Sequence, residues 1–498
     1  MVATSTASTS PPEQPQQGGS GAASAHNLPT DHADSTQQAP QEPAISGNPR
    51  RNFRLNLEKV AEVFSFEGEL DLTKTTELPS YDDHNYRVFL KKSSLHEDKS
   101  YVVKAQNSKY VSADHVQLQV EAMLHLKAKG VPCPVPIPVQ VEAHTAPEDG
   151  GTSTATNPDC TTREITAIPS YLHHIEEDNC LVHVITFIDD SKLFPERDDA
   201  TAEYVQKPRE FFQHLGEITA EVHDAMEDFC GGADERHPWR LKTATFTWEW
   251  STSTIPEVVA DKIEKFLGND EPERKKLQKL LAERVANVLP LTPEKVEKEL
   301  GRASSSLYDK QHNGVVDPDC EQDNTHGRTK EVQFLSRFFR KQWVHTDLND
   351  TNILFRAIDL HTKCFEYGAV LDFGDSCFDY CLYDIGITAA YACMYQETLS
   401  IAEIIANICY GYFHQGTTQF PKECLQYVYA VAVGRTLLSL TCACEQIFLQ
   451  PDNEYVAHTA QPLKDVAGKH LAEFESLDDA VEKIAKCLLL LHADAARE

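Results

Sequence analysis

The sequence predicts an α+β fold with two lobes, a small β-rich N-terminal lobe and a larger α-rich C-terminal lobe. Short alternating or continuous apolar segments in the first part of the chain are typical of strands. These segments are 78–90, 101–104 and 181–188. Long apolar segments with helical spacing occupy the last part of the chain. They lie at about 382–396, 399–413, 422–448 and 475–493.

Helical spacing predicts further helices in both lobes. Residues 56–66 and 112–129 belong to the first lobe, and Gly130 with the prolines that follow ends the second of these helices. In the second lobe a helix begins after Pro208 and ends near His223. We expect His223 to be a packing residue. Residues 255–300 alternate in charge and predict one or two solvated helices.

Composition divides the chain into a tail and two lobes. Residues 1–50 contain almost no large apolar side chains, so they predict a disordered tail. The first lobe is predicted at 51–188, with a polar insertion at 141–165. The second lobe is predicted at 189–498, with a polar insertion at 303–330.

Charge and cysteine content narrow the class of protein. The 77 acidic residues exceed the 46 basic residues and give a net charge of −31. Such a chain is a poor partner for nucleic acid or an anionic membrane, and it suits a cationic substrate. The 14 cysteines are scattered, which is typical of reduced thiols. With neither a secretory signal nor a long uninterrupted apolar run, we expect a cytoplasmic protein that does not span a membrane.

Two polar turns between apolar strands carry the chemistry. The first runs from His345 through Asp347 to Asn352, and the second follows an apolar run and begins at Asp372 in the sequence Asp-Phe-Gly-Asp. Phosphoryl transfer needs a group that orients the attacking hydroxyl and oxygen ligands for Mg²⁺. Asp347 can accept the hydroxyl proton, while Asn352 and Asp372 can hold the metal. The order H-x-D-x4-N and then D-F-G is that of kinases, so we predict a protein-kinase-like fold.

These motifs resemble the aminoglycoside phosphotransferase family of small-molecule kinases. The family usually has Gly where this chain has Thr346, and it places an aspartate after its metal strand, here Asp384. Residues 78–88, Leu-Pro-Ser-Tyr-Asp-Asp-His-Asn-Tyr-Arg-Val, are similar to the opening of those members that phosphorylate 5-hydroxy-L-lysine. The resemblance covers roughly 55–490, apart from the two insertions.

The resemblance extends to the nucleotide site. Lys104 occupies the place of the family's phosphate-binding lysine at the end of a strand, and Glu121 is the candidate partner of its ammonium. The segment 181–188 leads to the hinge between the lobes. There the backbone groups of Thr186, Phe187 and Ile188 would bond the purine ring.

The turn at 80–85 contains no glycine, unlike the Gly-rich loop of protein kinases. Ser80 and Asn85 can offer donors to phosphate. Asp82 and Asp83 are expected to point away from it, to solvent, to a substrate amine or to a turn N–H.

Supporting roles are predicted around the catalytic turn. We expect His345 to pack beneath the turn and to hydrogen-bond backbone. Asp384 is expected to anchor the turn through its N–H groups, and Asp375 to support Asp372 or to face a substrate amine. Three tryptophans either line the substrate site, where aromatic faces attract ammonium groups, or belong to the core. They are Trp239, Trp248 and Trp250.

The resemblance implies Mg²⁺-dependent transfer of the γ-phosphate of a nucleoside triphosphate, GTP favoured over ATP, to the hydroxyl of 5-hydroxy-L-lysine, a cationic amino alcohol. A kinase for homoserine, choline or a methylthio-sugar is an alternative. A catalytically silent pseudokinase is another alternative, although it would normally have lost Lys104, Asp347, Asn352 or Asp372.

Overall fold

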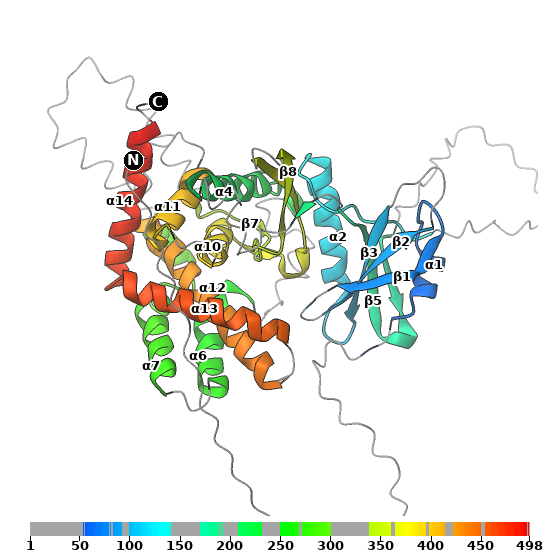
Figure 1. Cartoon of the computed structure of the whole chain (residues 1–498), viewed down its shortest axis with the longest axis horizontal. Helices are drawn as coiled ribbons and strands as arrows, with labels where there is room; N and C mark the ends of the chain where they lie inside the picture. Colours follow the sequence, from blue (N-terminus) through cyan, green and yellow to red (C-terminus); the bar gives the residue numbers. More distant parts are fainter. Residues whose placement is uncertain are drawn as a thin grey trace, which may run out of the picture. The chain divides into compact units, whose positions relative to one another are not determined.

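A computed structural model describes most of the chain (Figure 1). The described residues are 53, 55–78, 80, 83–91, 99–140, 170–188, 191–192, 208–231, 250–267, 271–299, 338–359, 364–394, 398–413, 422–449, 454–495 and 497. The predicted tail (1–50) and both polar insertions (141–165 and 303–330) lie outside them. The described residues belong to one unit, Ser46–Glu498.

The N-terminal lobe is built on a five-stranded antiparallel sheet with the strand order β1-β2-β3-β5-β4. The strands are β1 (Leu70–Leu78), β2 (His84–Leu90), β3 (Ser100–Asn107), β4 (Leu172–Ile175) and β5 (Cys180–Thr186). Alternate residues of β2 and β3, such as Val88 and Val103, are fully buried in the core of this lobe. The three predicted strands are therefore confirmed, and the sheet gains β1 and β4.

Strand β3 is longer than the sequence predicts. Lys104 does not close it, because the strand continues to Asn107, with β5 paired along its whole end and β2 paired as far as Ala105. Lys104 pairs in register with Asn85 and His183. Its side chain is therefore held in the middle of the sheet, and only 6% of the residue is exposed.

Helix α2 (Ala113–Ala128) follows the sheet, after the short α1 (Leu57–Val63) that precedes it. Ser112 caps its start, because the Ser112 side chain accepts a hydrogen bond from the backbone N–H of His115. Gly130, at φ 86°, turns the chain beyond its end. The apolar face of α2 belongs to the larger core of the C-terminal lobe, so this helix joins the two lobes.

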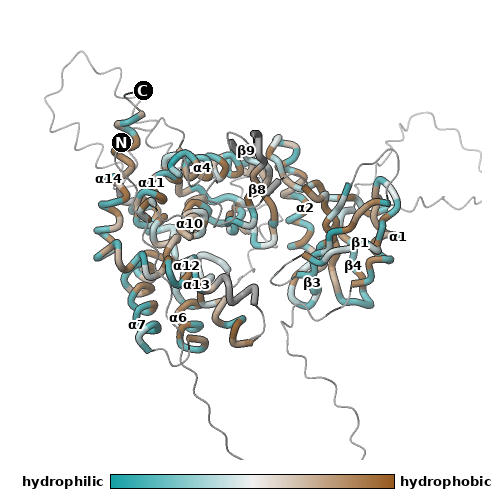
Figure 2. The backbone as a smooth tube through the Cα atoms, viewed as in Figure 1, coloured by the Kyte–Doolittle hydropathy of each residue, from teal (hydrophilic) through white to brown (hydrophobic). Residues whose placement is uncertain are grey.

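The C-terminal lobe is mostly helical. Its long helices are α4 (Pro208–Ala225), α6 (Ile255–Phe266), α7 (Glu271–Leu280), α10 (Cys381–Ala392), α11 (Ile401–Tyr412), α12 (Lys422–Leu449), α13 (Glu454–Glu473) and α14 (Leu477–Ala495). Its short helical turns are η3 (Phe229–Gly231), η4 (Thr252–Thr254), η5 (Leu281–Val285) and η7 (Phe373–Asp375), while η2 (Glu176–Asp178) connects β4 to β5 in the N-terminal lobe. Figure 2 shows polar and apolar residues alternating along α6 and α7, as expected of half-solvated helices. The structure is thus the two-lobed α+β fold that the sequence predicts.

Helix α12 is the buried centre of this lobe. By length and composition its residues Cys424–Leu449 could cross a membrane, but 94% of the apolar window is buried inside the structure. Helices α6, α10, α13 and α14 pack around it. We therefore interpret α12 as the core helix of a globular lobe.

Two small antiparallel sheets hold the two predicted turns. The catalytic turn runs from His345 to Asn352, and the metal turn begins at Asp372. One pairs β7 (Lys341–Val344) with β10 (Cys377–Tyr380). The other has the order β6-β8-β9, with β6 at Ser191–Lys192, β8 at Ile353–Asp359 and β9 at Cys364–Val370. The first turn connects β7 to β8 and the second connects β9 to β10, so the strand pairing brings the two turns together.

Helices α4 and α11 cross at very close range. A Cβ atom built on Gly216 would lie 2.1 Å from the Ile408 carbonyl oxygen, and one on Gly411 would lie 1.8 Å from the Gln213 carbonyl oxygen. Real Cβ atoms do not approach backbone oxygens so closely. The two glycines therefore set the distance between these helices.

The glycine contact predicts a specific loss of stability. Gly216→Ala should lower the free energy of unfolding by about 3 kcal/mol or more, because the backbone of α11 must move away. Gly468→Ala on α13 is the matched control, since its Cβ would meet nothing within 4 Å. The control should be neutral or stabilising by about 0.5–1 kcal/mol. Urea denaturation of both variants measures the difference, and equal stabilities would contradict the close crossing.

Candidate active site

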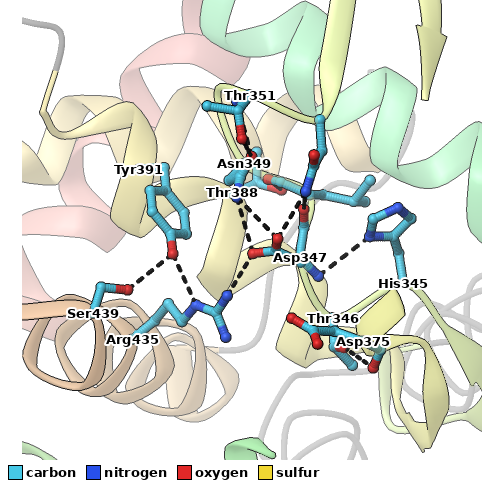
Figure 3. Close-up of polar contacts among 12 residues, drawn as sticks. His345, Thr346, Asp347, Asn349, Thr351, Asp375, Thr388, Tyr391, Arg435 and Ser439 are labelled. Carbon is cyan, nitrogen blue, oxygen red and sulfur yellow. Dashed lines mark hydrogen bonds and ion pairs between the residues drawn. The ribbon is translucent and has the colours of Figure 1, made fainter. Parts of the chain in front are cut away.

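The turn between β7 and β8 presents the Asp347 carboxylate surrounded by donors (Figure 3). The side-chain amide of Asn349 lies 3.0 Å from both carboxylate oxygens. The amide of Asn352 donates to Oδ2 at 2.7 Å and to the Asp347 carbonyl at 2.9 Å. The guanidinium of Arg435 pairs with Oδ1. The carboxylate is therefore held in one orientation from three sides.

A second, fully buried carboxylate fixes the backbone of this turn. Asp384, on α10, accepts the N–H of His345 at 2.9 Å on Oδ2 and that of Thr346 at 2.7 Å on Oδ1. His223 of α4 also bonds Oδ2, at 2.9 Å, and its other ring nitrogen lies 2.8 Å from the Tyr412 hydroxyl. These are the N–H contacts that the sequence predicts for Asp384. His223 has the expected packing role.

The neutral imidazole of His345 joins the two turns. Its Nδ1 accepts the N–H of Asp347 at 3.3 Å, so Nε2 carries the proton and donates to the Leu371 carbonyl at 2.8 Å. Burial lowers the pKa of His345 and favours this uncharged form, although Asp384 opposes the shift. The ring also contacts Phe373, with centroids 4.9 Å apart. His345 thus packs beneath the turn, as predicted.

Thr346 adopts a left-handed backbone conformation, with φ 60°. This conformation is costly for a β-branched residue. The cost explains why glycine is usual at this position in the family that the sequence motifs resemble. The Thr346 hydroxyl donates to the Asp375 carbonyl, and Asp384 binds the Thr346 N–H. These two bonds hold the strained residue in place.

The metal turn lies directly beside the catalytic turn. The backbone N–H of Leu371 donates to the Asn352 carbonyl at 2.8 Å, which makes Asp372 the next residue along. Asp372 also has a positive φ, 54°, and its Oδ1 accepts the N–H of Gly374 at 3.2 Å. On the other side, His115 of α2 lies 2.6 Å from the Gly374 carbonyl. The metal turn is therefore fixed by both lobes.

The residues predicted to hold a metal fit a hard cation. Asn352 uses only its amide nitrogen in the hydrogen bonds among described residues, which leaves its Oδ1 available. Asp372 uses only Oδ1 there, which leaves Oδ2 available. Among the described residues no three His, Cys, Asp or Glu gather as a metal site. One amide, one carboxylate and the oxygens of a nucleotide are a suitable donor set for Mg²⁺.

The predicted Lys104–Glu121 pair is wrong. The Lys104 ammonium lies 2.6 Å from Asp372 Oδ1 and 3.9 Å from Asp83 Oδ2. Glu121 instead accepts a hydrogen bond from Gln117, one turn earlier on α2, at 3.1 Å. Burial lowers the pKa of Lys104, but Asp372 and Asp83 outweigh it and keep the pKa above its ordinary value. Lys104 is therefore a charged group at the metal turn.

The turn before β2 also differs from the prediction. Asp83 points inward, because its carboxylate accepts from Gln106 at 3.2 and 3.3 Å and faces Lys104. The hydroxyl of Ser80 accepts the Asp83 N–H at 3.2 Å and closes the turn. Asn85 is buried, and its Oδ1 has no hydrogen-bond partner among the described residues. Asp82 lies outside the described residues.

The proposed purine contacts need a partial correction. The N–H of Thr186 already donates to the Val135 carbonyl at 2.9 Å, and that of Phe187 donates to the Ser100 carbonyl at 3.0 Å. The sheet and its neighbouring segment thus occupy both donors. Ile188 is the member of this trio whose N–H could still bond a purine.

Arg435 is the main site residue that the sequence did not predict. It lies on α12, 2% exposed, and its Nε donates to the Tyr391 hydroxyl at 3.2 Å. The guanidinium also lies 4.6 Å from the ring centre of Trp250. One signal was available, since Arg435 is a lone cation within a long apolar stretch. Trp239 and Trp248 lie outside the described residues.

The environment tunes Asp347 toward proton transfer. Burial raises the pKa of this carboxyl, Arg435 lowers it, and the charges of Asp375 and Asp372 raise it again, to about 8. A proton acceptor works best when its pKa lies near the operating pH. The arrangement can therefore orient a hydroxyl and take its proton beside a bound metal and phosphate.

The buried hydroxyl of Thr346 provides a test of how the turn is held. Thr346→Val keeps the β-branched shape but leaves the Asp375 carbonyl without its donor, so unfolding should require about 1–3 kcal/mol less. Thr346→Ser keeps the hydroxyl, so its free energy of unfolding should fall less than that of Thr346→Val. Thermal and urea unfolding of the two variants give the comparison. A serine variant as unstable as the valine variant would show that this hydrogen bond contributes nothing.

Known proteins match most of the chain. A hydroxylysine kinase from Mus musculus is 23% identical over 440 residues, which cover 85% of this chain and 90% of that protein. An amicoumacin kinase solved with AMP-PNP and Ca²⁺ has 13% identity and a TM-score of 0.44, covering 84% of this chain and 93% of that chain. A microcompartment-associated aminopropanol kinase has 16% identity and a TM-score of 0.40, and the match covers 80% of this chain and 93% of that chain.

The family assignment rests on the match to a family model. Residues 75–417 match the model of the APH family, described as the phosphotransferase enzyme family. This range contains both turns, Lys104 and Asp384. Because it spans well over half of the 498 residues, this chain belongs to the phosphotransferase enzyme family.

Proposed function

We propose that this phosphotransferase is a small-molecule kinase that transfers the γ-phosphoryl group of GTP to the hydroxyl of 5-hydroxy-L-lysine. The observation that carries the proposal is the Asp347 carboxylate, held by Asn352 and Arg435 next to the metal turn. The choice of substrate is supported by the hydroxylysine kinase relative, which matches 85% of this chain. The choice of GTP rests on the resemblance to the kinases of this amino acid.

Each charged group then has a role in the reaction. The acceptor hydroxyl donates a hydrogen bond to Asp347 and attacks the γ-phosphorus in line. A new oxygen–phosphorus bond forms, the bond to the β-phosphate oxygen breaks, and GDP leaves with that electron pair. The hydroxyl proton passes to Asp347 and then to solvent. Lys104, a buried cation at the metal turn, is placed to bind phosphate oxygens.

Mg²⁺ is part of the proposal. Bound by the free oxygens of Asn352 and Asp372, it would neutralise charge on the phosphates. A cytoplasmic location is proposed as well, on the basis of the composition and the cysteine pattern of the sequence.

A substrate panel tests the function. Purified protein with Mg²⁺ and either GTP or ATP should release nucleoside diphosphate fastest with 5-hydroxy-L-lysine and GTP. Asp347→Asn should reduce kcat by about 10²–10⁴-fold, because the hydroxyl loses its proton acceptor. Asp478→Asn, an exposed change on α14, is the control and should retain activity.

Other outcomes of the panel have clear meanings. Turnover of choline, homoserine or a methylthio-sugar without turnover of hydroxylysine would assign a different acceptor. Wild-type protein that turns over none of them, while still binding nucleotide, would identify a catalytically silent kinase fold. Full activity of Asp347→Asn would remove Asp347 from the reaction.

The metal site has a separate test. EDTA should abolish turnover and Mg²⁺ should restore it. Asn352→Ala should raise the Mg²⁺ concentration needed for half-maximal activity by about 10-fold or more, since one oxygen ligand is lost. Asn287→Ala, an exposed asparagine in the same lobe, should leave this concentration unchanged. An unchanged Mg²⁺ requirement in Asn352→Ala would exclude Asn352 as a ligand.

A further inference from the structure

Arg435 is a buried cation with more donors than partners. The residue is 2% exposed and lies on the apolar core helix α12. A guanidinium carries five N–H donors, and a buried charge is costly unless these donors are satisfied. Nη2 is paired with Asp347 and Nε with the Tyr391 hydroxyl. Nη1 is buried and has no hydrogen-bond partner in the part of the chain that the structure describes.

The free nitrogen belongs to the active site. In Figure 3 the guanidinium lies against Asp347, and the nitrogen without a dashed line points away from Asp347 and Tyr391. Buried donors without partners are rare in folded proteins. Because this one adjoins the carboxylate that takes the hydroxyl proton, a ligand that binds there is a natural partner for it.

The aromatic surroundings indicate which ligand group fits. The centre of the guanidinium lies 4.6 Å from the ring centre of Trp250 and 5.6 Å from that of Tyr391. Aromatic faces of this kind bind quaternary ammonium groups when they are open. Here the protein's own cation occupies them. The position therefore repels a substrate ammonium and attracts an anion.

The geometry of Asp347 indicates which molecule supplies that anion. Arg435 contacts Oδ1, whereas Asn352, the proposed metal ligand, contacts Oδ2. The metal and the phosphates belong on the Asn352 side, where Lys104 provides the cation at Asp372. The Arg435 side is thus the side of the acceptor molecule. A carboxylate accepts hydrogen bonds from the N–H groups that lie in the plane of a guanidinium.

We propose that Nη1 of Arg435 binds the carboxylate of the acceptor substrate and thereby selects hydroxy amino acids over amino alcohols that lack a carboxylate. The inference rests on the proposed function, since it assigns an acceptor amino acid to the Asp347 site. In 5-hydroxy-L-lysine a short flexible carbon chain separates the carboxylate from the hydroxyl. The hydroxyl can therefore lie on Asp347 while the carboxylate reaches the neighbouring guanidinium.

A matched pair of substrates tests this role. One is 5-hydroxy-L-lysine and the other is its methyl ester, which keeps the hydroxyl and both amines but has no carboxylate. Wild-type kcat/KM should be about 10²-fold higher for the acid, a loss expected when a charged hydrogen-bonding partner is removed. Arg435→Lys should reduce this ratio to a few-fold, mainly by raising KM for the acid. Arg209→Lys, an exposed change on α4, should leave the ratio unchanged.

The alternatives give different results. If Arg435 only positions Asp347, Arg435→Lys will lower kcat equally for both substrates and keep their ratio, which overturns the proposal. If the guanidinium binds the γ-phosphate, KM for GTP will rise while the ratio stays, which also overturns it. The ratio of kcat/KM for the acid to that for the ester is measured first on the wild-type protein, so this part of the test does not depend on the folding of a variant. A wild-type ratio near one overturns the proposal by itself. If neither substrate is phosphorylated, the proposed function fails and the inference fails with it.

Discussion

The site depends on one buried carboxylate that never touches the reacting atoms. Asp384 is completely buried, and its two oxygens collect the N–H groups of His345 and Thr346 and the ring of His223. A buried charge is stable only when such donors satisfy it. Because α4, α10 and the catalytic turn each supply one part of this network, the turn takes its shape from the helical lobe. Thr346 can then keep its left-handed conformation, and Asp347 projects in a fixed direction.

The elements that the sequence predicts well are those defined by local pattern. The catalytic and metal turns, β5 and helices α4, α10, α11, α12 and α14 each follow from a short run of residues. Helix α13 was missed, because Pro462 and Gly468 interrupt its pattern and because packing against α12 stabilises it regardless. Strand β3 was predicted too short, since its last residues, Gln106 and Asn107, are polar but are paired with β5.

The errors in the site arise where distant parts of the chain meet. Glu121 has the right residue type for a partner of Lys104, but the rotation of α2 about its axis cannot be derived from sequence, and in the structure Glu121 bonds Gln117 of the same helix rather than Lys104. Asp83 turns inward because Gln106, two residues beyond Lys104 on β3, supplies a donor for it. Arg435 lies 88 residues from Asp347, and no local pattern connects them. Only the packing of α12 brings its cation to the catalytic turn.

The charges of the site are arranged to be completed by ligands. Four carboxylates, those of Asp83, Asp347, Asp372 and Asp375, act on one another and on two cations, Lys104 and Arg435. Lys104 pairs with Asp372 and, at 3.9 Å, with Asp83, whereas Arg435 pairs with Asp347. The pairing keeps the buried acids compatible with folding, yet among these described residues the four carboxylates outnumber the two cations. A divalent cation at Asp372 and an amine near Asp375 would balance that excess. A phosphate would in turn meet the cation of Lys104, and a carboxylate would meet that of Arg435. Each ligand would therefore enter a position that already carries the opposite charge.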